Sequence, residues 1–380
     1  MRKIIPILLV LCLLLCACDP VAVEISAPEV SLPTVSPTLA PTVAPTPKPT
    51  PIPSPTSTAE PTSAPTRQLF ENWDIEDNDL DGIGTIRGNT NGNLATGGRA
   101  VDAGDTIYYI LNPSEWGKKQ MKLLAYDKAS GMEMVLLDEE IYLGALNWDG
   151  NLLWFAHSSS DANSPDEICT LNPNTREMQV VFEGGKSVMI IYGLALVETW
   201  YFEGDWSYPR TICLDINTHE ILYTYDRFCA TSAMDGWLYG SGGDPRTISD
   251  KFYKMRPDGT QKKRCAPVSV AADGKLYYYD RYKTVGHYPA KSSLQLMITD
   301  AKSGKTRKLL FKNMTFDCAL NLSHERIYLL DDETADLYTT DLDGANLAHL
   351  PDLAISWLQG LTLLNGEPAN RIVPCDPLRG

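Results

Sequence analysis

The feature that most constrains the fold of this chain is a repeat of about 43 residues, which begins near residue 84 and continues toward the carboxyl terminus. Once in each unit, a short polar turn containing a Gly or an Asn separates two β-like stretches. These turn residues are Gly131, Asn174, Asn217, Gly259, Gly304 and Gly344, at intervals of 43, 43, 42, 45 and 40 residues. Gly and Asn tolerate the positive φ that a tight turn between strands requires. A period of this length indicates an array of similar structural units.

Each unit also contains an apolar, aromatic-rich segment that follows an acidic or Gly-containing turn. Tyr, Trp and Ile favour strands because their bulky side chains pack well on a half-buried pleated surface. The segments are AGDTIYYI (103–110), WDGNLLWF (148–155), MDGWLYG (234–240), ADGKLYYYD (272–280) and SHERIYLLD (323–331), with LVETWYF (196–202) as a degenerate copy. Apolar residues at helical spacing are nowhere sustained, so each unit is predicted to contain four strands.

Four-stranded units of this length arranged around a ring predict an all-β fold, a β-propeller. A pair of β-sandwiches is the alternative, but sandwiches lack a fixed internal period. Dividing residues 84–380 by about 43 gives about seven units, so seven blades are favoured, and six blades with a terminal extension are the alternative. The seventh blade would combine both chain ends, with inner strands from ISWLQGLTLLNG and RIVPC and an outer strand near GTIRGN. Such closure removes exposed edge strands.

The amino terminus has the pattern of a lipoprotein signal peptide over residues 1–17. Arg2 and Lys3 precede an apolar run of roughly twelve residues, which is too short to span a bilayer as a helix. The ending Leu15-Cys16-Ala17-Cys18 resembles the bacterial lipobox. This resemblance implies that Cys18 becomes the lipidated amino terminus, whose acyl chains, such as palmitate, anchor the protein to the membrane. An ordinary secretory signal peptide is the alternative.

Residues 18–68 are dominated by Pro, Thr, Ser and Ala and are predicted to form a disordered stalk. A proline-rich chain extends by about 3.1 Å per residue, so some forty residues reach on the order of 120 Å. A stalk of this kind suits a protein held out through a cell wall, on the extracellular face of a Gram-positive membrane. A periplasmic location is the alternative. Residues 69–380 are left as the folded propeller domain.

Charge and cysteine content limit the partners and the chemistry. The formal net charge is −15, and it becomes −17 once Arg2 and Lys3 are removed, which disfavours nucleic acid as a partner. After the signal peptide and the lipidated residue, six cysteines remain, and their even number permits disulfides outside the cell. Their wide spacing contains no CxxC pair, which favours buried free thiols and leaves the disulfide state open. These are Cys169, Cys213, Cys229, Cys265, Cys318 and Cys375.

The stretch EDNDLDGIG, residues 76–84, raises the question of a calcium site. Asp77, Asp79 and Asp81 alternate as calcium ligands do, but position twelve counted from Asp77 is Gly88, where a helix-loop-helix calcium site needs an acid. Residues 79–82 also repeat DLDG of residues 341–344, which occupies the turn position of a repeat unit. A hairpin turn is therefore favoured, and a looser calcium turn is the alternative.

The stretch GNTNGNLATGGRAVDAGDTIYYI, residues 88–110, resembles an uncharacterised bacterial surface family, domain of unknown function 5050. The shared elements are Gly88-Asn89, Gly92-Asn93, Gly97-Gly98 and the strand from Gly104 to Tyr109. The resemblance covers most of residues 85–380 and implies a propeller akin to those of lipoprotein-receptor ectodomains. Units two and three depart from it, with Trp-Phe and Trp-Tyr in place of a double Tyr. The family implies no activity.

Motifs for nucleophilic, phosphate or metal chemistry are absent from the sequence. There is no GxSxG, GxxxxGK[ST] or GxGxxG, and the histidines show neither HxxxH nor HExxH spacing. No cofactor is predicted, and His157 is the one histidine that follows an aromatic strand. Three Cys-Ala pairs, at 229–230, 265–266 and 318–319, precede inner-strand candidates; small buried filler is the favoured interpretation, and a thiolate metal cluster is the alternative.

Aromatic residues in predicted loops are the candidates for ligand binding. Trp116, Trp206 and Tyr208 fall in long segments between strands, where aromatic side chains can stack on sugar rings or anchor a protein. The sequence therefore favours a lipid-anchored, monomeric binding module whose partner is cell-wall glycan or a surface protein. A carbohydrate-active enzyme with a carboxylate pair in the channel mouth is the alternative. A structural assembly factor is a third interpretation.

Overall fold

The structure is a computed structural model, and it describes residues 88–111, 121–139, 141–159, 165–243, 251–279, 294–311, 319–331, 336–350, 361–364 and 367–368. The chain divides into two units, Met1–Thr62 and Ser63–Gly380, and every described residue belongs to the second. Among these residues, no helix has the length and apolar character needed to cross a bilayer.

Several predicted features lie outside the described residues and stay predictions. They are the signal peptide, Cys18, the stalk, Asp77, Asp79, Asp81, Trp116, Cys318 and Cys375.

The described residues form six four-stranded antiparallel sheets, which we call blades 1 to 6, and each blade uses four strands that are consecutive in the chain. Blade 1 contains β1 (Ala100–Asp102), β2 (Thr106–Leu111), β3 (Met121–Asp127) and β4 (Glu133–Glu139). Blade 2 contains β5 (Ile141–Trp148), β6 (Leu153–Ser159), β7 (Glu167–Leu171) and β8 (Met178–Glu183). Blade 3 contains β9 (Ser187–Ile191), β10 (Leu194–Glu203), β11 (Trp206–Asp215) and β12 (Ile221–Asp226).

The remaining strands continue the same pattern around the ring. Blade 4 contains β13 (Cys229–Met234), β14 (Trp237–Gly242), β15 (Lys251–Met255) and β16 (Lys263–Arg264). Blade 5 contains β17 (Val270–Ala272), β18 (Lys275–Tyr279), β19 (Leu294–Asp300) and β20 (Thr306–Phe311). Blade 6 contains β21 (Ala319–Leu322), β22 (Arg326–Leu330), β23 (Leu337–Asp341) and β24 (Ala348–His349). A two-stranded sheet follows, with β25 (Leu363–Leu364) and β26 (Glu367–Pro368).

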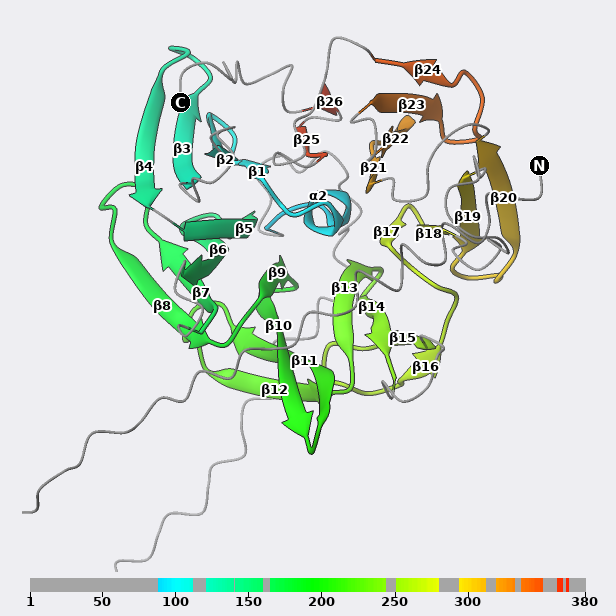
Figure 1. Cartoon of the computed structure of the whole chain (residues 1–380), viewed down its shortest axis with the longest axis horizontal. Coiled ribbons are helices and arrows are strands. Elements are labelled where there is room, and N and C mark those ends of the chain that lie inside the picture. Colours follow the sequence, from blue (N-terminus) through cyan, green and yellow to red (C-terminus); the bar gives the residue numbers. More distant parts are fainter. Residues whose placement is uncertain are drawn as a thin grey trace, which may run out of the picture. The chain divides into compact units, whose positions relative to one another are not determined.

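This arrangement is a β-propeller and confirms the predicted fold class. Figure 1 shows the blades in a ring, with the first strand of each blade nearest the centre. The described residues contain six complete blades, which is the alternative count, and β25–β26 is the one further sheet. Leu361 and Leu363 pack on blade 6, and Leu364 packs on blade 1, so β25 lies between the last and first blades.

The predicted mixed blade, built by pairing strands from both chain ends, is not among the sheets of the described residues. β25 pairs with β26, and Gly88 forms a bridge with Trp148 of blade 2. The ends nevertheless meet, because Asn93 donates to the carbonyl of Leu363 at 2.9 Å and accepts from its amide at 2.8 Å. Closure here rests on side-chain hydrogen bonds and apolar packing.

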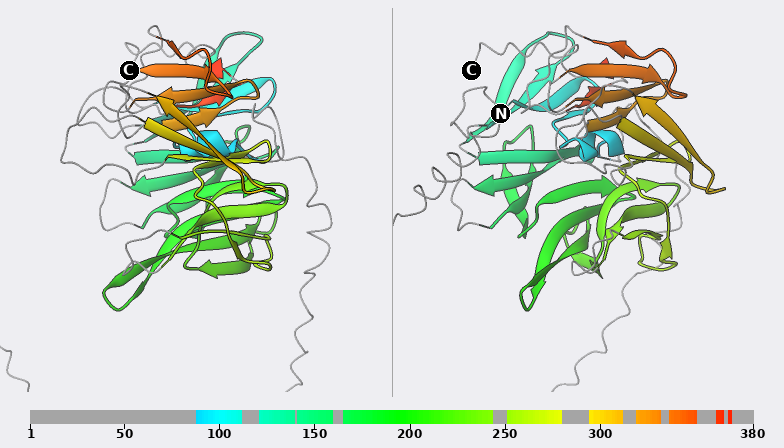
Figure 2. Two further views of the ribbon diagram at one scale, coloured as in Figure 1. Left: turned by 90° about the vertical axis from the view of Figure 1, so that its right-hand side faces the viewer. Right: turned by 45° about the vertical axis from the view of Figure 1, so that its right-hand side comes forward.

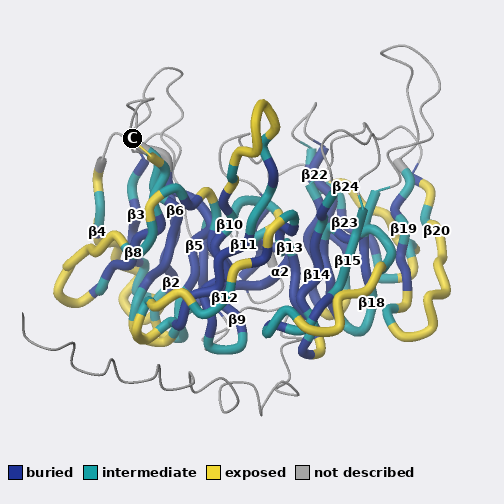
Figure 3. Tube along the Cα trace, turned by 90° about the horizontal axis from the view of Figure 1, so that it is seen from below, coloured by how far each residue is buried: buried dark blue, intermediate teal, exposed yellow. Residues whose placement is uncertain are grey.

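The aromatic-rich segments form the second strand of each blade, as predicted. Successive side chains of a strand point to opposite faces, and in a propeller both faces meet a neighbouring blade. In β6, Phe155 packs in the cluster shared with blade 1, and Trp154 packs in the cluster shared with blade 3. Both side chains are 0% exposed. Figure 3 shows these inner strands buried and the turns exposed.

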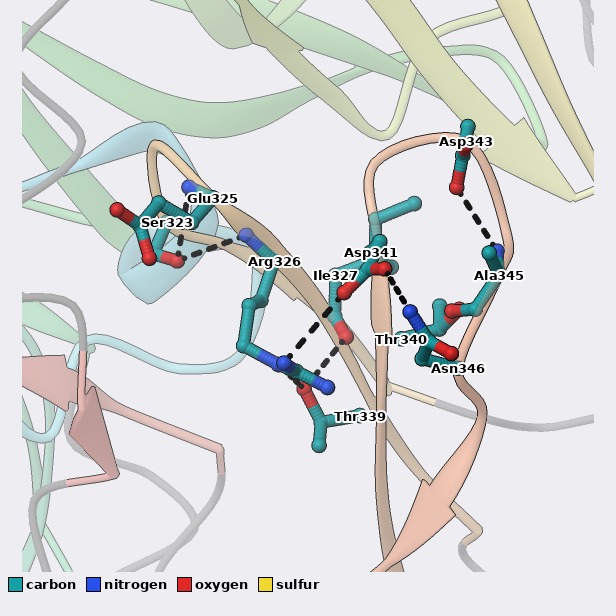
Figure 4. Close-up of polar contacts among 10 residues, drawn as sticks. All are labelled: Ser323, Glu325, Arg326, Ile327, Thr339, Thr340, Asp341, Asp343, Ala345 and Asn346. Atoms are coloured by element: carbon teal, nitrogen blue, oxygen red, sulfur yellow. Dashed lines mark hydrogen bonds and ion pairs between the residues drawn. The ribbon is translucent and has the colours of Figure 1, made fainter.

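In the tight turn that joins the third and fourth strands of a blade, the acidic side chains accept hydrogen bonds from the turn itself. In blade 6, Asp343 accepts a hydrogen bond from the backbone amide of Ala345 at 2.9 Å. Asp341 accepts one from the side-chain amide nitrogen Nδ2 of Asn346 at 2.6 Å (Figure 4). This turn has the letters DLDG and joins β23 to β24. The hairpin interpretation thus holds for residues 341–344, while the copy at 79–82 lies outside the described residues.

In two of the turns, the residue with positive φ is not the predicted one. Units two and three were expected to place Asn174 and Asn217 at positive φ, but the residues that adopt it are Arg176 (φ 62°) and His219 (φ 61°). In these five-residue turns the amide of the fifth residue donates to the carbonyl of the first, at 2.8 and 2.9 Å. The backbone amides of Asn174 and Asn217 instead donate to a side-chain oxygen of the first residue of the turn. These bonds hold the two asparagines without positive φ.

Candidate ligand-binding hairpin

The axis of the ring is filled by the chain itself. The short helix α2 (Asn91–Ala95) lies at the centre of the ring in Figure 1, and it comes from the GNTNGN segment. Its N-cap is Thr90, whose side chain accepts from the amide of Asn93 at 3.0 Å. Asn89, Asn91 and Asn93 are at most 3% exposed. Buried amides are costly unless hydrogen-bonded, so their partners decide whether this segment is stable there.

Each of these three Asn side chains bonds to the inner strands of different blades. Asn89 donates to the carbonyls of Ala100 in blade 1 and Leu146 in blade 2, both at 2.8 Å. Asn91 donates to the carbonyls of Ala233 in blade 4 at 2.7 Å and Ala271 in blade 5 at 2.8 Å.

Asn93 completes the set between blade 6 and β25. It accepts from the side chain of Asn321 at 2.8 Å and donates to Leu363. We call Asn89, Asn91 and Asn93 the axial amides. Their bonding gives a physical reason for the three asparagines of the GNTNGN segment.

The buried carboxylates of the described chain come from three different blades. Asp102, Asp215 and Asp331 belong to blades 1, 3 and 6 respectively. Asp102 is 0% exposed and accepts from Lys128 Nζ at 2.7 Å on both oxygens. Asp215 accepts from turn amides at 2.8 and 2.9 Å. The carboxylates of Asp102 and Asp215 are therefore engaged in local structure.

The feature that departs from the repeat is the hairpin of β10 and β11, which extends past the rest of blade 3. Each strand has ten residues, but β9 pairs with β10 only as far as Glu198, and β12 pairs with β11 only from Arg210 onward. Residues 199–209 are therefore a two-stranded projection (Figures 1 and 2). Figure 3 shows its tip exposed. This segment was predicted to be a loop, and the strands continue because its aromatic residues pair across the hairpin.

Three large apolar side chains of this projection are exposed. Trp200 is 41% exposed, Phe202 is 76% exposed and Trp206 is 45% exposed. Since neighbours in a strand alternate faces, Trp200 and Phe202 lie on one face of the hairpin. Trp206 lies on the other face, beside its partner Glu203. The structure thus leaves aromatic surface on both sides of one element.

Tyr208, the other described candidate, is 2% exposed and supports the hairpin from within. Its ring stacks on that of its cross-strand partner Tyr201, with centroids 5.6 Å apart. The guanidinium of Arg227 covers the Tyr208 ring at 4.4 Å and pairs with Glu203 at 2.7 Å. Hydrogen bonds to Tyr201 and to Glu203 raise the pKa of Arg227 above its ordinary value. The stack holds the tip in a defined orientation.

No disulfide joins any of the four cysteines in the described part of the chain. Cys169, Cys213 and Cys229 are buried, and Cys265 is partly buried. Burial raises the pKa of Cys213 to about 12 and that of Cys265 to about 11, so both thiols are protonated at neutral pH. Cys229 and Cys265 do not belong to a group of metal-ligating residues in the described chain.

Comparisons with known proteins give similarity to solved structures alone. No protein-family model matches the chain, and no curated protein matches it. A prolyl endopeptidase structure aligns with a TM-score of 0.48 and 15% identity, over 72% of this chain and 44% of that chain. The β-propeller domain of the Trilobed protease from Pyrococcus furiosus aligns with a TM-score of 0.46 and 14% identity, over 65% of this chain and 80% of that chain.

TolB from Acinetobacter baumannii is also similar, with a TM-score of 0.39 and 14% identity, over 65% of this chain and 63% of that chain. The matched region spans less than half of the prolyl endopeptidase chain and less than two thirds of the TolB chain. At these identities the likeness concerns the fold alone, and a propeller hosts many functions. Function must therefore be argued from the residues.

Proposed function

We propose that this protein is a lipid-anchored β-propeller that acts as a binding module, with the β10–β11 hairpin as its ligand-binding element. The observation that carries the proposal is the exposure of Trp200, Phe202 and Trp206 on a projection that has no third strand. Exposed large apolar side chains gathered on one element mark interaction sites.

A glycan of the cell envelope is the ligand class that we propose. Aromatic faces stack on the apolar faces of sugar rings, and charged groups beside them bond to hydroxyls. Glu203 and Arg227 supply such groups next to Trp206, and their ion pair is exposed enough to exchange with a ligand, with side chains 51% and 42% exposed. A surface protein is the alternative partner.

Location follows from the amino-terminal sequence and is part of the proposal. A lipid on Cys18 and a Pro/Thr-rich stalk of residues 18–68 would hold the propeller at a distance from the outer face of the membrane. Metabolic labelling with a palmitate analogue, compared between the wild type and Cys18→Ser, tests the anchor. Loss of label in the variant is expected, and equal labelling of both proteins would contradict it.

Co-sedimentation of the full chain with purified cell-wall polysaccharide tests the binding proposal. The triple variant Trp200→Ala, Phe202→Ala and Trp206→Ala should lower binding at least about tenfold, since a large apolar side chain that becomes fully buried contributes about 1.5–3 kcal/mol. Met132→Ala with Met178→Ala is the matched control, because both side chains are exposed but lie on other blades. Equal binding by the triple variant would overturn the proposal.

The enzyme alternative predicts a different outcome. A carbohydrate-active enzyme would release soluble sugar products and lose that release when carboxylates become amides. Incubation of the full chain with the polysaccharide, followed by assay of reducing ends, separates turnover from binding. Binding to protein extracts but not to polysaccharide would instead favour a protein partner.

A further inference from the structure

Two neighbouring strands of blade 2 bring together three residues of metal-ligating type, which we call the His–Glu–Cys cluster: His157, Glu167 and Cys169. β6 and β7 are antiparallel, and His157 lies directly opposite Glu167. Cys169 is two residues beyond Glu167, so both side chains of β7 point to the same face of the sheet. The register of the strands thus places all three on one face of blade 2.

The donor atoms of the cluster are close. Nδ1 of His157 lies 3.2 Å from a carboxylate oxygen of Glu167, and the ligand atoms of all three residues lie within 4.8 Å of one another. A tetrahedral zinc ion, with bonds of roughly 2.0–2.3 Å, holds its ligand atoms about 3.3–3.8 Å apart. The donor atoms of the cluster therefore lie within about 1 Å of the separations that a zinc ion requires.

Burial of the cluster is graded from the core to the surface. Cys169 is 0% exposed and packs with Phe155 and Leu171, whereas the side chains of His157 and Glu167 are 13% and 27% exposed. The thiol therefore lies at the base of the site, and the imidazole and carboxylate lie toward solvent. An ion can reach the cluster from that side.

We propose that the His–Glu–Cys cluster binds a zinc ion. Thiolate sulfur, imidazole nitrogen and carboxylate oxygen are the three protein ligand types that zinc takes, and a borderline-soft ion suits this mixed set better than calcium or magnesium, which prefer oxygen. Water completes the fourth position. The site is independent of the hairpin, which belongs to blade 3.

Charge and protons balance in this site. On binding, the Cys169 S–H bond breaks, a zinc–sulfur bond forms and the proton passes to solvent. The thiolate and the Glu167 carboxylate together carry a charge of −2, which neutralises the ion in a partly buried place. The His157 imidazole would bind the metal through Nδ1, in place of its contact with Glu167, and an imidazole bound in this way carries its proton on Nε2.

The test uses the full chain without a histidine tag, stripped of metal with a chelator and kept reduced. Zinc content by mass spectrometry should reach one ion per chain, and the melting temperature should rise, because an ion bound only by the folded state stabilises it. Cobalt(II), titrated in place of zinc, should give a thiolate-to-cobalt charge-transfer absorption that zinc removes.

Variants separate the site from the fold. Cys169→Ser should abolish the cobalt–thiolate absorption, and Glu167→Gln should weaken zinc binding by at least about 100-fold, since even groups that only orient ligands cost 10- to 100-fold. Cys213→Ser is the matched control, because Cys213 is a buried free thiol in the corresponding strand of blade 3. Should Cys169→Ser fail to fold, Glu167→Gln, whose side chain is partly exposed, carries the test.

Absence of the cobalt–thiolate absorption in the folded wild type would overturn the proposal. So would zinc binding that is unchanged in both Cys169→Ser and Glu167→Gln.

Discussion

At the scale of single residues, the axial amides fill the axis of the ring in place of apolar side chains. Near the axis the inner strands of different blades converge and present backbone carbonyls to one another. A carbonyl buried without a partner costs about 1–3 kcal/mol. One Asn amide satisfies two such carbonyls from two blades, as Asn89 and Asn91 both do. Apolar side chains could fill this space but could not satisfy these groups.

Asn91→Ala should therefore lower the free energy of unfolding by about 3 kcal/mol, because it leaves the carbonyls of Ala233 and Ala271 without this donor. Urea denaturation measures the change. Asn174→Ala is the control, because Asn174 is exposed and its φ is not positive, and it should change stability by less than about 0.5 kcal/mol. Equal effects of the two substitutions would contradict the role of the axial amides.

Gly92→Ala should destabilise the ring although Ala is the better helix former. A Cβ at Gly92 would lie 1.9 Å from Oδ1 of Asn321, which is 0% exposed and is held by bonds to Asn93 and Leu361. Overpacking of this kind costs about 1–3 kcal/mol, more than the roughly 1 kcal/mol that Ala gains over Gly in a helix.

Thermal unfolding checks this prediction, with Gly243→Ala as its control. A Cβ at Gly243 meets nothing within 4 Å, so its melting temperature should stay near that of the wild type. A melting temperature of Gly92→Ala at or above the wild-type value would show that Asn321 yields without cost.

At the scale of elements, the β10–β11 hairpin has a separable base and tip. The base pairs with β9 and β12. Among the described residues, the contacts of the tip beyond Tyr201 and Tyr208 are its own cross-strand pairs and the ion pair of Glu203 with Arg227. Stability of the blade and exposure of the aromatic residues thus reside in different parts of one element.

Replacing residues 202–207 with Asn-Gly should preserve the fold and abolish ligand binding. Tyr201 and Tyr208 are cross-strand partners, so a two-residue turn can join them directly. The melting temperature is expected to fall by less than about 4 °C, the shift that about 1 kcal/mol causes in a domain of this size, because Phe202 and Trp206 are largely exposed already. Circular dichroism and co-sedimentation give the two measurements, and a large loss of stability would show that the tip is structural.

At the scale of the whole molecule, the buried phenols and thiols make stability depend on alkaline pH. Burial raises the pKa of Cys213 to about 12 from 9.0 and that of Tyr277 to about 12 from 10.0. Tyr225 and Tyr239 are also raised, first by burial. A raised folded-state pKa means that the unfolded chain loses the proton first.

The free energy of unfolding should therefore have its full value below about pH 9 and should decrease as the pH rises toward 12. A group as buried as Cys213 lowers the free energy of unfolding by at most about 1.4 kcal/mol per pH unit in this window. Urea denaturation at pH 7, 9 and 10.5, with phenolate absorbance followed in parallel, measures the loss. Constant stability up to pH 11 would mean that these groups titrate normally in the folded protein.

The repeat, the four strands in each unit and the identity of the second strand were predictable, because each depends on local turn residues and on alternation within a short segment. Trp206 was predicted to lie in a loop and is instead an exposed residue of strand β11. Tyr208 was not distinguishable from it by sequence, since its burial depends on Arg227, nineteen residues along the chain.

By itself, the sequence determined that the chain consists of four-stranded modules of nearly equal length, whose sheet faces are buried only against neighbouring modules. Tertiary structure alone decided what closes the ring and what occupies its axis. Local sequence preferences do not predict that Gly88 to Asn93 would lie at the axis and bond to the inner strands. These bonds join residues up to 270 positions apart in the sequence, such as Asn93 and Leu363. The same holds for His157, Glu167 and Cys169, which meet only through the register of two strands.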